Sequence, residues 1–213
     1  MHTVGNLAQL ERAATRRLAN IEARLLRYDI PPTSEQERGV ALCLIDAQST
    51  WSQFARFFFV SSVLGARRGG GAYTTVTVGG LHTAEDAITF AILTFSPKRK
   101  KRSKFRPLDE PPWHKGSILP RLAQAVGLSN QAQVNLAFSI QARALEDLPI
   151  ARNFFAHRSR DTAALLEAIA PRYGLPDSTR AGALPGHLDP RRPHSIAAGW
   201  VAELRAIVRH IGL

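Results

Sequence analysis

The sequence predicts an all-α protein: one domain over residues 1–213, built as a helical bundle with loop insertions and at most a short β-hairpin. Apolar residues recur at three- and four-residue steps over most of the chain, which is the spacing of amphipathic helices. Alternation typical of a β-strand is confined to residues 73–78. A chain of this length buries a core without disulfides, and its single cysteine, Cys43, cannot form an internal bridge.

Two long helices are expected first. Residues 7–28 are amphipathic, and a pair of prolines follows them. Ser34 and Glu37 have the spacing of a capping box, which opens a helix running to about residue 64. One stripe of this second helix is interpreted as a central packing element rather than a binding site; its members are Val40, Leu44, Ala47, Trp51, Phe54 and Phe58.

Three segments interrupt the helical pattern and are predicted to be mobile insertions. They are rich in glycine or proline, which favour turns and loops over regular helices. They lie near 65–80, 97–115 and 174–194. The first contains the alternating residues, which leave room for a short hairpin.

Three helices are expected between the first insertion and Pro149, one before the second insertion and two after it. Thr83 and Asp86 are spaced to cap a helix over residues 84–95. Apolar periodicity then predicts helices over residues 117–126 and 130–148. Pro149 is expected to end or kink the last of these helices, because proline cannot donate the backbone hydrogen bond of a helix interior.

Three further helical segments complete the prediction. Pro149 can occupy the first turn of the next helix, whose opening residues are 150–158. Residues 161–173 continue helically, and residues 195–211 form a final amphipathic helix. This arrangement places the residues directly after Pro149 near a helix N-terminus, where free N–H groups and the helix dipole favour a phosphate.

The charge balance favours a polyanionic partner. The chain has 28 Lys and Arg against 17 Asp and Glu, a formal net charge of +11. Nearly all of the basic residues are arginine, whose planar fork of donors matches phosphate oxygens. The alternative is coding bias, since a GC-rich coding sequence produces a chain rich in alanine and arginine. On charge alone, nucleic acid is the favoured interpretation.

One run of basic residues stands within the second insertion. It consists of Lys98, Arg99, Lys100, Lys101 and Arg102. Such a run can hold RNA phosphates near a site, act as an address signal, or simply be a solvated loop. We expect RNA contact here, and also at Arg158 and Arg160 further along the chain.

Several other functions find no support in the sequence. The seven histidines are scattered, so no metal site and no cofactor are predicted; His187, Asp189 and His194 share a loop and could hold a metal only adventitiously. No phosphate-binding glycine motif is present. No apolar segment suits a membrane span, and the first residues lack a secretion signal. A cytoplasmic protein without membrane partners is therefore expected.

One segment has the residues for chemistry on RNA, Arg152-Asn153-(x3)-His157. On a helix, Asn153 and His157 are four residues apart and share one face, and the long Arg152 side chain can reach the same space. A histidine can take a proton from a 2′-OH or return one to the leaving oxygen near neutral pH. An arginine can stabilise the charge that develops on the phosphorus. This pair suffices for transesterification of RNA without metal, leaving a 2′,3′-cyclic phosphate.

The specificity of this pattern comes from the asparagine. Arginine and histidine at this spacing occur twice, because Arg205 and His210 also match, but Ala206 stands in the asparagine position there. We interpret that second match as a basic helix end. A purely structural alternative remains for the first match, with Arg152 and Asn153 pairing locally and His157 as a half-buried core histidine.

The motif resembles that of HEPN (higher eukaryotes and prokaryotes nucleotide-binding) domains, an arginine, a polar residue, three further residues and a histidine late in an all-helical chain. Residues 51–56, on the long second helix, are similar to an aromatic helix that these domains often carry. The resemblance covers residues 34–173, with the motif as its specific part. It implies an HEPN-like helical bundle that commonly dimerises, bringing two motifs into one cleft.

The resemblance also implies a function. Many HEPN domains are ribonuclease toxins or anti-phage effectors, so Arg152 and His157 would be catalytic and Asn153 would orient the site. RNA and a second copy of the chain are the expected partners, and a cognate antitoxin or regulatory protein is a further one that this setting allows. A subgroup carries a modified tyrosine two residues after the histidine, where this chain has Ser159. Other HEPN domains bind RNA without cutting it, which leaves a non-catalytic RNA-binding or adaptor protein as the alternative.

Overall fold

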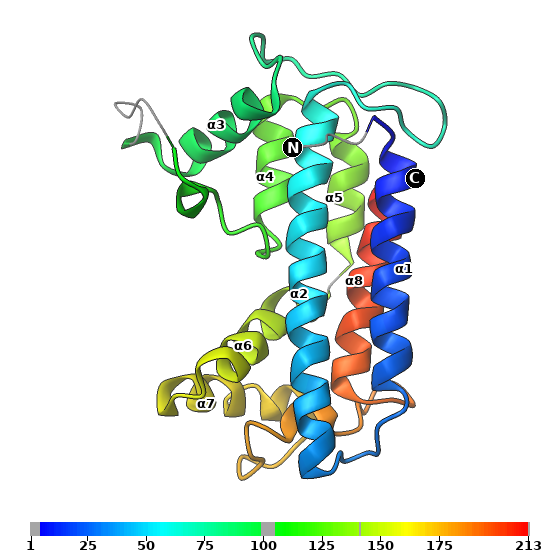
Figure 1. The fold of residues 1–213 in the computed structure, drawn as a ribbon, viewed down its shortest axis with the longest axis vertical. Helices are drawn as coiled ribbons and strands as arrows, with labels where there is room; N and C mark the ends of the chain where they lie inside the picture. Colours follow the sequence, from blue (N-terminus) through cyan, green and yellow to red (C-terminus); the bar gives the residue numbers. More distant parts are fainter. Residues whose placement is uncertain (1–4, 99–104, 141, 213) are drawn as a thin grey trace. The chain divides into compact units, whose positions relative to one another are not determined.

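A computed structural model describes residues 5–98, 105–140 and 142–212, and helices dominate it (Figure 1). The α-helices are α1 (Leu7–Leu25), α2 (Ser34–Val63), α3 (Ala84–Phe95), α4 (Ile118–Val126), α5 (Gln131–Ser139), α6 (Ala144–His157), α7 (Arg160–Glu167) and α8 (Ile196–Gly212). Short 3₁₀ helices are η2 (Pro107–Asp109), η3 (Ala170–Tyr173) and η4 (Leu184–Gly186). The prediction of an all-α fold is confirmed.

The predicted hairpin is reduced to isolated contacts. Within the described residues, backbone bridges of the β type pair Asn6 with Arg67, Arg67 with Tyr73, and Leu188 with Ser195, without any named strand. The side chain of Thr74 is buried and donates to the backbone oxygen of Ser62 at 2.7 Å, so the first insertion is tied to the end of α2.

The chain forms two compact units. Of the described residues, the first unit takes those within Met1–Ala14, Trp51–Ile140 and Ile207–Leu213. The second takes those within Thr15–Thr50 and Gln141–Ala206. Helices α1, α2 and α8 therefore contribute residues to both units, whereas α3 to α5 belong to the first and α6 and α7 to the second.

In the first unit, α3 packs against α4 and α4 against α5. An aromatic cluster on α2 supplies much of the core, with Phe54, Phe58 and Phe59 fully buried. Beside it, Glu110 accepts hydrogen bonds from Arg56 at 2.6 and 2.8 Å and from the Trp113 indole at 2.8 Å. These contacts fix the segment between α3 and α4 to the middle of α2.

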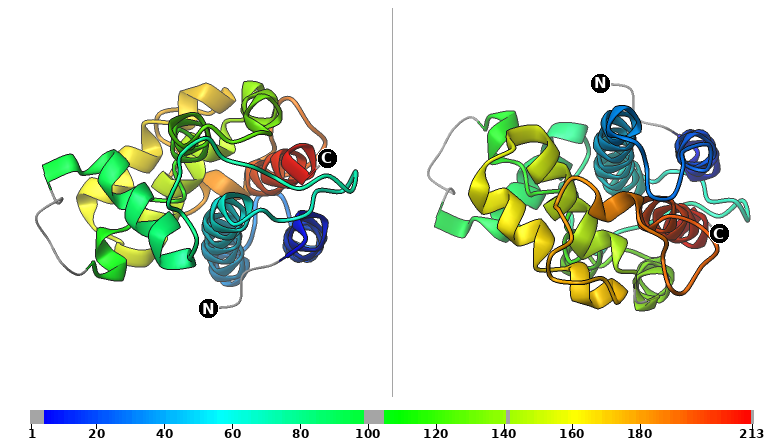
Figure 2. Two further views of the ribbon diagram at one scale, coloured as in Figure 1. Left: turned by 90° about the horizontal axis from the view of Figure 1, so that it is seen from above. Right: turned by 90° about the horizontal axis from the view of Figure 1, so that it is seen from below.

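In the second unit, parts of α1, α2 and α8 lie side by side, and α6 and α7 pack against each other (Figures 1 and 2). Ion pairs join the three long helices: Arg17 with Asp46 at 2.5 Å, and Arg205 with Glu22 at 3.1 Å. Because Arg205 belongs to the second Arg-x4-His match, its pairing with α1 agrees with the interpretation of that match as structural.

The predicted core stripe of α2 is confirmed. Its six positions are all buried, namely Val40, Leu44, Ala47, Trp51, Phe54 and Phe58. Burial of large apolar side chains is the main favourable term in folding, at about 1.5–3 kcal/mol for each one. The stripe accounts for a helix of 30 residues without a proline or an internal break.

Two predicted helix starts differ in outcome. The capping box of Thr83 and Asp86 is present at the start of α3. At the start of α2 the reciprocal bonds instead join Thr33 and Gln36, at 3.3 Å between the Gln36 N–H and the threonine hydroxyl and 3.0 Å between the Thr33 N–H and the glutamine oxygen. The pair Ser34–Glu37 is thus wrong by one residue, because two overlapping pairs satisfy the same spacing rule.

Candidate functional site

Helix α6 carries the Arg-Asn-x3-His motif, and the motif lies at its C-terminal end rather than near an N-terminus. The expected single helix over 130–148 is two helices, α5 and α6, and Pro149 stands inside α6. The start of α6 is set by a distant side chain, because Glu203 on α8 accepts a hydrogen bond from the Ala144 N–H at 2.9 Å. That cap makes Ala144 a helix start despite the proline that follows.

The motif side chains point away from the buried stripe of α6. The stripe consists of Ala144, Asp147, Leu148, Ala151 and Phe155. Asn153 and His157 project from the other side of the helix, one turn apart, and Arg152 lies between that side and the stripe. Helical spacing alone therefore brings the asparagine and the histidine together.

The three side chains are accessible to a ligand to different degrees. Arg152 and Asn153 are half-buried, and His157 is exposed. Within the part of the chain that the structure describes, no hydrogen bond or ion pair engages any of the three. The structural alternative, in which His157 is a half-buried core histidine with locally paired neighbours, is therefore wrong.

A tight turn follows the histidine directly. Arg158 ends α6 in the left-handed conformation, at φ 47° and ψ 37°, and its N–H donates to the Phe154 oxygen at 2.7 Å. Ser159 then caps α7 through Thr162, each accepting a bond from the other's backbone N–H. Ser159 thus serves as the N-cap of α7.

The electrostatics of this end differ from the expectation. The C-terminal end of a helix carries partial negative charge, which favours cations such as the neighbouring Arg158 and offers no free N–H groups to a phosphate. Arg158 and Arg160 are both exposed and lie within three residues of His157 in the chain. Any attraction of RNA to this end must therefore come from side chains rather than from the α6 backbone.

Of the basic run in the second insertion, the structure describes Lys98 alone. Lys98 is exposed and belongs to the first unit, whereas the motif belongs to the second. The other predicted members, Arg99, Lys100, Lys101 and Arg102, lie outside the described residues.

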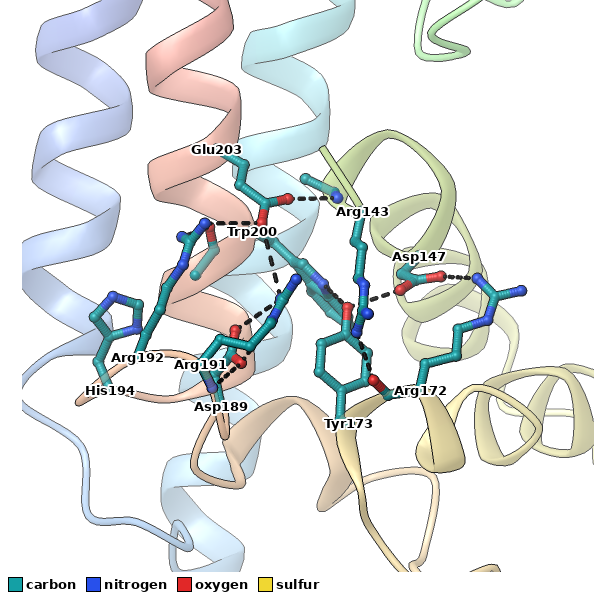
Figure 3. A network of polar contacts seen from close by, with 12 residues as sticks. Arg143, Asp147, Arg172, Tyr173, Asp189, Arg191, Arg192, His194, Trp200 and Glu203 are labelled. Atoms are coloured by element: carbon teal, nitrogen blue, oxygen red, sulfur yellow. Dashed lines mark hydrogen bonds and ion pairs between the residues drawn. The ribbon is translucent and has the colours of Figure 1, made fainter. Parts of the chain in front are cut away.

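A network of charged and aromatic side chains lies beside the first half of α6 (Figure 3). It was not among the sites predicted from the sequence. Asp147 is fully buried; one of its oxygens accepts from Arg172 and the other from the Tyr173 hydroxyl, both at 2.7 Å. The Tyr173 oxygen in turn accepts from the Trp200 indole N–H at 2.6 Å. The detectable signal in the sequence is an aspartate inside the apolar stripe of a helix.

The same network continues along the loop before α8. Glu203, which caps α6, also accepts from Arg192 at 2.9 Å, and Asp189 holds Arg191 through two bonds at 3.0 and 2.9 Å (Figure 3). Both carboxylates are buried, at 6% and 1% exposure, so each needs these cationic partners. His194 lies beside them; its ring nitrogen contacts the Ser195 oxygen at 3.2 Å, and its backbone oxygen accepts from the Asp189 N–H at 2.9 Å.

Burial shapes the protonation of this network. It raises the pKa of Asp147 above its ordinary value, against the opposing influence of Tyr173 and Arg172. Burial and the hydrogen bond to Asp147 also raise the pKa of Tyr173, so the phenol stays protonated and donates. At Asp189, burial acts to raise the pKa, but the hydrogen bonds and charge of Arg191 outweigh it and hold the pKa below its ordinary value.

Neither a metal centre nor a membrane segment emerges from the described residues. No group of three or more His, Cys, Asp or Glu among them is placed to hold a metal ion. None of their helices combines the length and apolar character that a bilayer crossing requires.

Comparison with known proteins gives no family assignment. Searches against models of protein families, against curated proteins and against solved structures each return no match for this chain.

Proposed function

We propose that this protein is a metal-independent endoribonuclease of the HEPN type, with Arg152, Asn153 and His157 as its catalytic residues. One observation carries the proposal: an arginine, an asparagine and a histidine lie within two turns at the end of one helix, accessible and without polar partners among the described residues. Side chains that are accessible and not engaged by the rest of the protein can pair with a substrate at no cost to the fold.

Each residue has a role that fits its chemistry. His157 takes the proton from a 2′-OH, or returns one to the leaving oxygen, and its exposure leaves room for an RNA strand to approach. Arg152 stabilises negative charge that builds on the phosphorus during the reaction. Asn153, one turn before His157, orients the substrate or the imidazole. The 2′-oxygen attacks the adjacent phosphorus and the bond from phosphorus to the 5′-oxygen breaks. The products are one fragment ending in a 2′,3′-cyclic phosphate and one beginning with a 5′-hydroxyl, whose oxygen takes up a proton.

The RNA partner is supported by charge near the motif. Arg158 and Arg160 are exposed and flank the turn after His157, and the chain carries a net charge of +11. Arginine side chains at this place offset the unfavourable dipole of the α6 end. By resemblance to HEPN domains, we further propose a homodimer that joins two motifs, and a setting as a toxin or anti-phage effector in the cytoplasm.

A second function is favoured by the same dipole. Because the motif lies at a helix C-terminus, the backbone does not help to stabilise charge on a phosphate. A protein that binds RNA without cutting it, or an adaptor, needs only the arginines and the exposed turn. This non-catalytic RNA-binding function is the rival to the nuclease.

The chemistry of the product ends separates the two. The purified chain is incubated with mixed cellular RNA in the presence of EDTA, and new ends are captured with a ligase that joins only 2′,3′-cyclic phosphates. The nuclease yields new cyclic ends whose number rises with time. Binding of RNA without new ends, by a protein whose folding is verified, would support the adaptor; ends that appear only with added metal would exclude the proposed mechanism.

A further inference from the structure

The apolar contacts of α6 specify its rotation poorly. Two of the four buried apolar positions on this helix are alanines, Ala144 and Ala151, which add no large side chain to interlock with a neighbour. Leu148 and Phe155 are the other two buried apolar positions. A helix with alanine at half of its buried apolar positions loses less buried area when it turns about its axis than one packed throughout by large interdigitated side chains.

Directional bonds supply what the apolar contacts lack. Both oxygens of Asp147 are taken, one by Arg172 and one by Tyr173, at 2.7 Å each. Such bonds weaken steeply when the donor angle departs from linearity, so they resist rotation of the helix more than apolar burial does. Asp147 stands five residues before Arg152 on the same helix, so both turn together.

The donors are themselves held in place. Trp200 is fully buried on α8; its indole N–H donates to the Tyr173 oxygen at 2.6 Å, and its ring meets the Tyr173 ring edge-on at 72°. The guanidinium groups of Arg143 and Arg191 lie 5.3 and 5.5 Å from the centre of the same ring. Figure 3 shows this chain of contacts running from α8 through Tyr173 to α6.

We infer that Asp147 and Tyr173 are positioning residues for RNA cleavage. Their hydrogen bond, together with the bond from Trp200 that ties Tyr173 to α8, sets the rotation of α6 about its axis. That rotation determines where Arg152 and His157 lie. This inference rests on the proposed nuclease function. Buried charged networks add little stability over apolar packing of the same volume, so a geometric role explains their presence here better than a stabilising one. A catalytic group displaced by about 1 Å can lose about 100-fold in rate, so a small rotation matters.

The test compares this network with a buried hydroxyl elsewhere in the chain. Tyr173→Phe removes the hydroxyl that reaches α6 and keeps the ring, whereas Thr74→Val removes a similarly buried hydroxyl that donates to the Ser62 oxygen and belongs to the other unit. We measure the single-turnover cleavage rate, the RNA dissociation constant, the thermal midpoint, and amide hydrogen exchange over residues 150–158. Asp147→Asn and the double variant with Tyr173→Phe complete a thermodynamic cycle.

The positioning role predicts a specific pattern. Tyr173→Phe should slow cleavage about 10- to 100-fold with RNA affinity unchanged within about 2-fold, and should speed exchange in the second half of α6. Thr74→Val should leave the cleavage rate and the exchange over residues 150–158 unchanged at a comparable shift in thermal midpoint. The double variant should cleave no more slowly than the slower single variant, because both substitutions disrupt the same hydrogen bond, the one between Asp147 and Tyr173.

Other outcomes overturn the inference. Equal effects of Tyr173→Phe and Thr74→Val on the cleavage rate would show that the loss follows overall stability, not the placement of α6. If the wild-type protein never cleaves RNA, the proposed function is wrong, but the positioning role can still be tested. Amide hydrogen exchange over residues 150–158 is then the deciding measurement. Unchanged exchange in Tyr173→Phe would in that case refute the positioning role.

Discussion

Arg158 stops α6 in a backbone conformation that is unfavourable for a residue with a Cβ. Its φ of 47° lies in the left-handed region, and its N–H closes a 2.7 Å bond to Phe154. That conformation costs an L-residue about 1 kcal/mol or more, and glycine adopts it freely. An arginine here is therefore retained against a preference for glycine, which fits a role for its exposed charge beside His157.

Two substitutions at this residue separate backbone from charge. Arg158→Gly should be more stable to urea than Arg158→Ala by about 1 kcal/mol, because only glycine relieves the left-handed conformation. Both remove the same guanidinium, so RNA titrations should give them equal affinities, weaker than wild type. Equal stabilities of the two variants would argue against the left-handed cap.

Glu110 is the second residue whose charge is tied to a definite contact. Burial acts to raise its pKa, but the hydrogen bonds from Arg56 and Trp113 and the Arg56 charge together hold the pKa below its ordinary value. A carboxylate with a lowered folded-state pKa stabilises the protein above its unfolded-state pKa. That contribution is lost as the pH falls through the folded-state value.

Glu110→Gln should therefore lower the free energy of unfolding by about 1–2 kcal/mol at pH 7, because a neutral amide accepts weaker hydrogen bonds from Arg56 than the carboxylate does. The difference from wild type should shrink as the pH falls below about 4, where the carboxyl group of the unfolded chain is already protonated. Urea unfolding at several pH values measures both. A difference that does not depend on pH would mean that packing, not charge, carries the effect.

At the scale of elements, Pro149 distinguishes two descriptions of α6. If the helix began at Pro149, the proline would be favourable in its first turn. The helix begins at Ala144 instead, so Pro149 is interior and removes one backbone hydrogen bond.

Pro149→Ala should thus raise the free energy of unfolding by about 1–2 kcal/mol, since alanine restores the missing donor and only part of the gain is offset in the unfolded chain. Pro120, in the first turn of α4, is the matched control, and Pro120→Ala should give no such gain. Thermal or urea unfolding of the two variants makes the comparison. A loss of stability in Pro149→Ala would place the proline at a helix start after all.

Helix α6 also shows how far the sequence can predict this fold and site. The cap of α3 and the buried stripe of α2 depend on residues within one turn of each other, so local spacing predicts them. The start of α6 depends on Glu203, 59 residues from Ala144, and no local rule contains that contact. The motif was predictable because its residues are adjacent on one helix, whereas the network around Tyr173 joins residues from separate segments.

At the scale of the whole molecule, the net charge of +11 sets the response to salt. Replacing the five residues Lys98, Arg99, Lys100, Lys101 and Arg102 by glutamine should weaken RNA binding and flatten its dependence on salt. Each lost phosphate contact should reduce the logarithmic slope by about 0.7 for single-stranded RNA. Filter binding from low to high salt measures the slope. An unchanged slope would show that the run makes no phosphate contact.

The rate of RNA cleavage tests the proposed nuclease function most directly. The comparison is wild type against His157→Ala in EDTA, with His210→Ala as the control from the second Arg-x4-His match. Circular dichroism and RNA affinity are recorded for each variant, because loss of folding or binding would lower the rate for unrelated reasons.

If His157 transfers the proton, His157→Ala should slow cleavage by about 100-fold or more, while helix content and RNA affinity stay as in wild type. The exposed position of His157 at the end of α6 is the reason to expect an intact fold. His210→Ala should cleave at the wild-type rate. A folded His157→Ala protein that cuts RNA as fast as wild type would contradict the account.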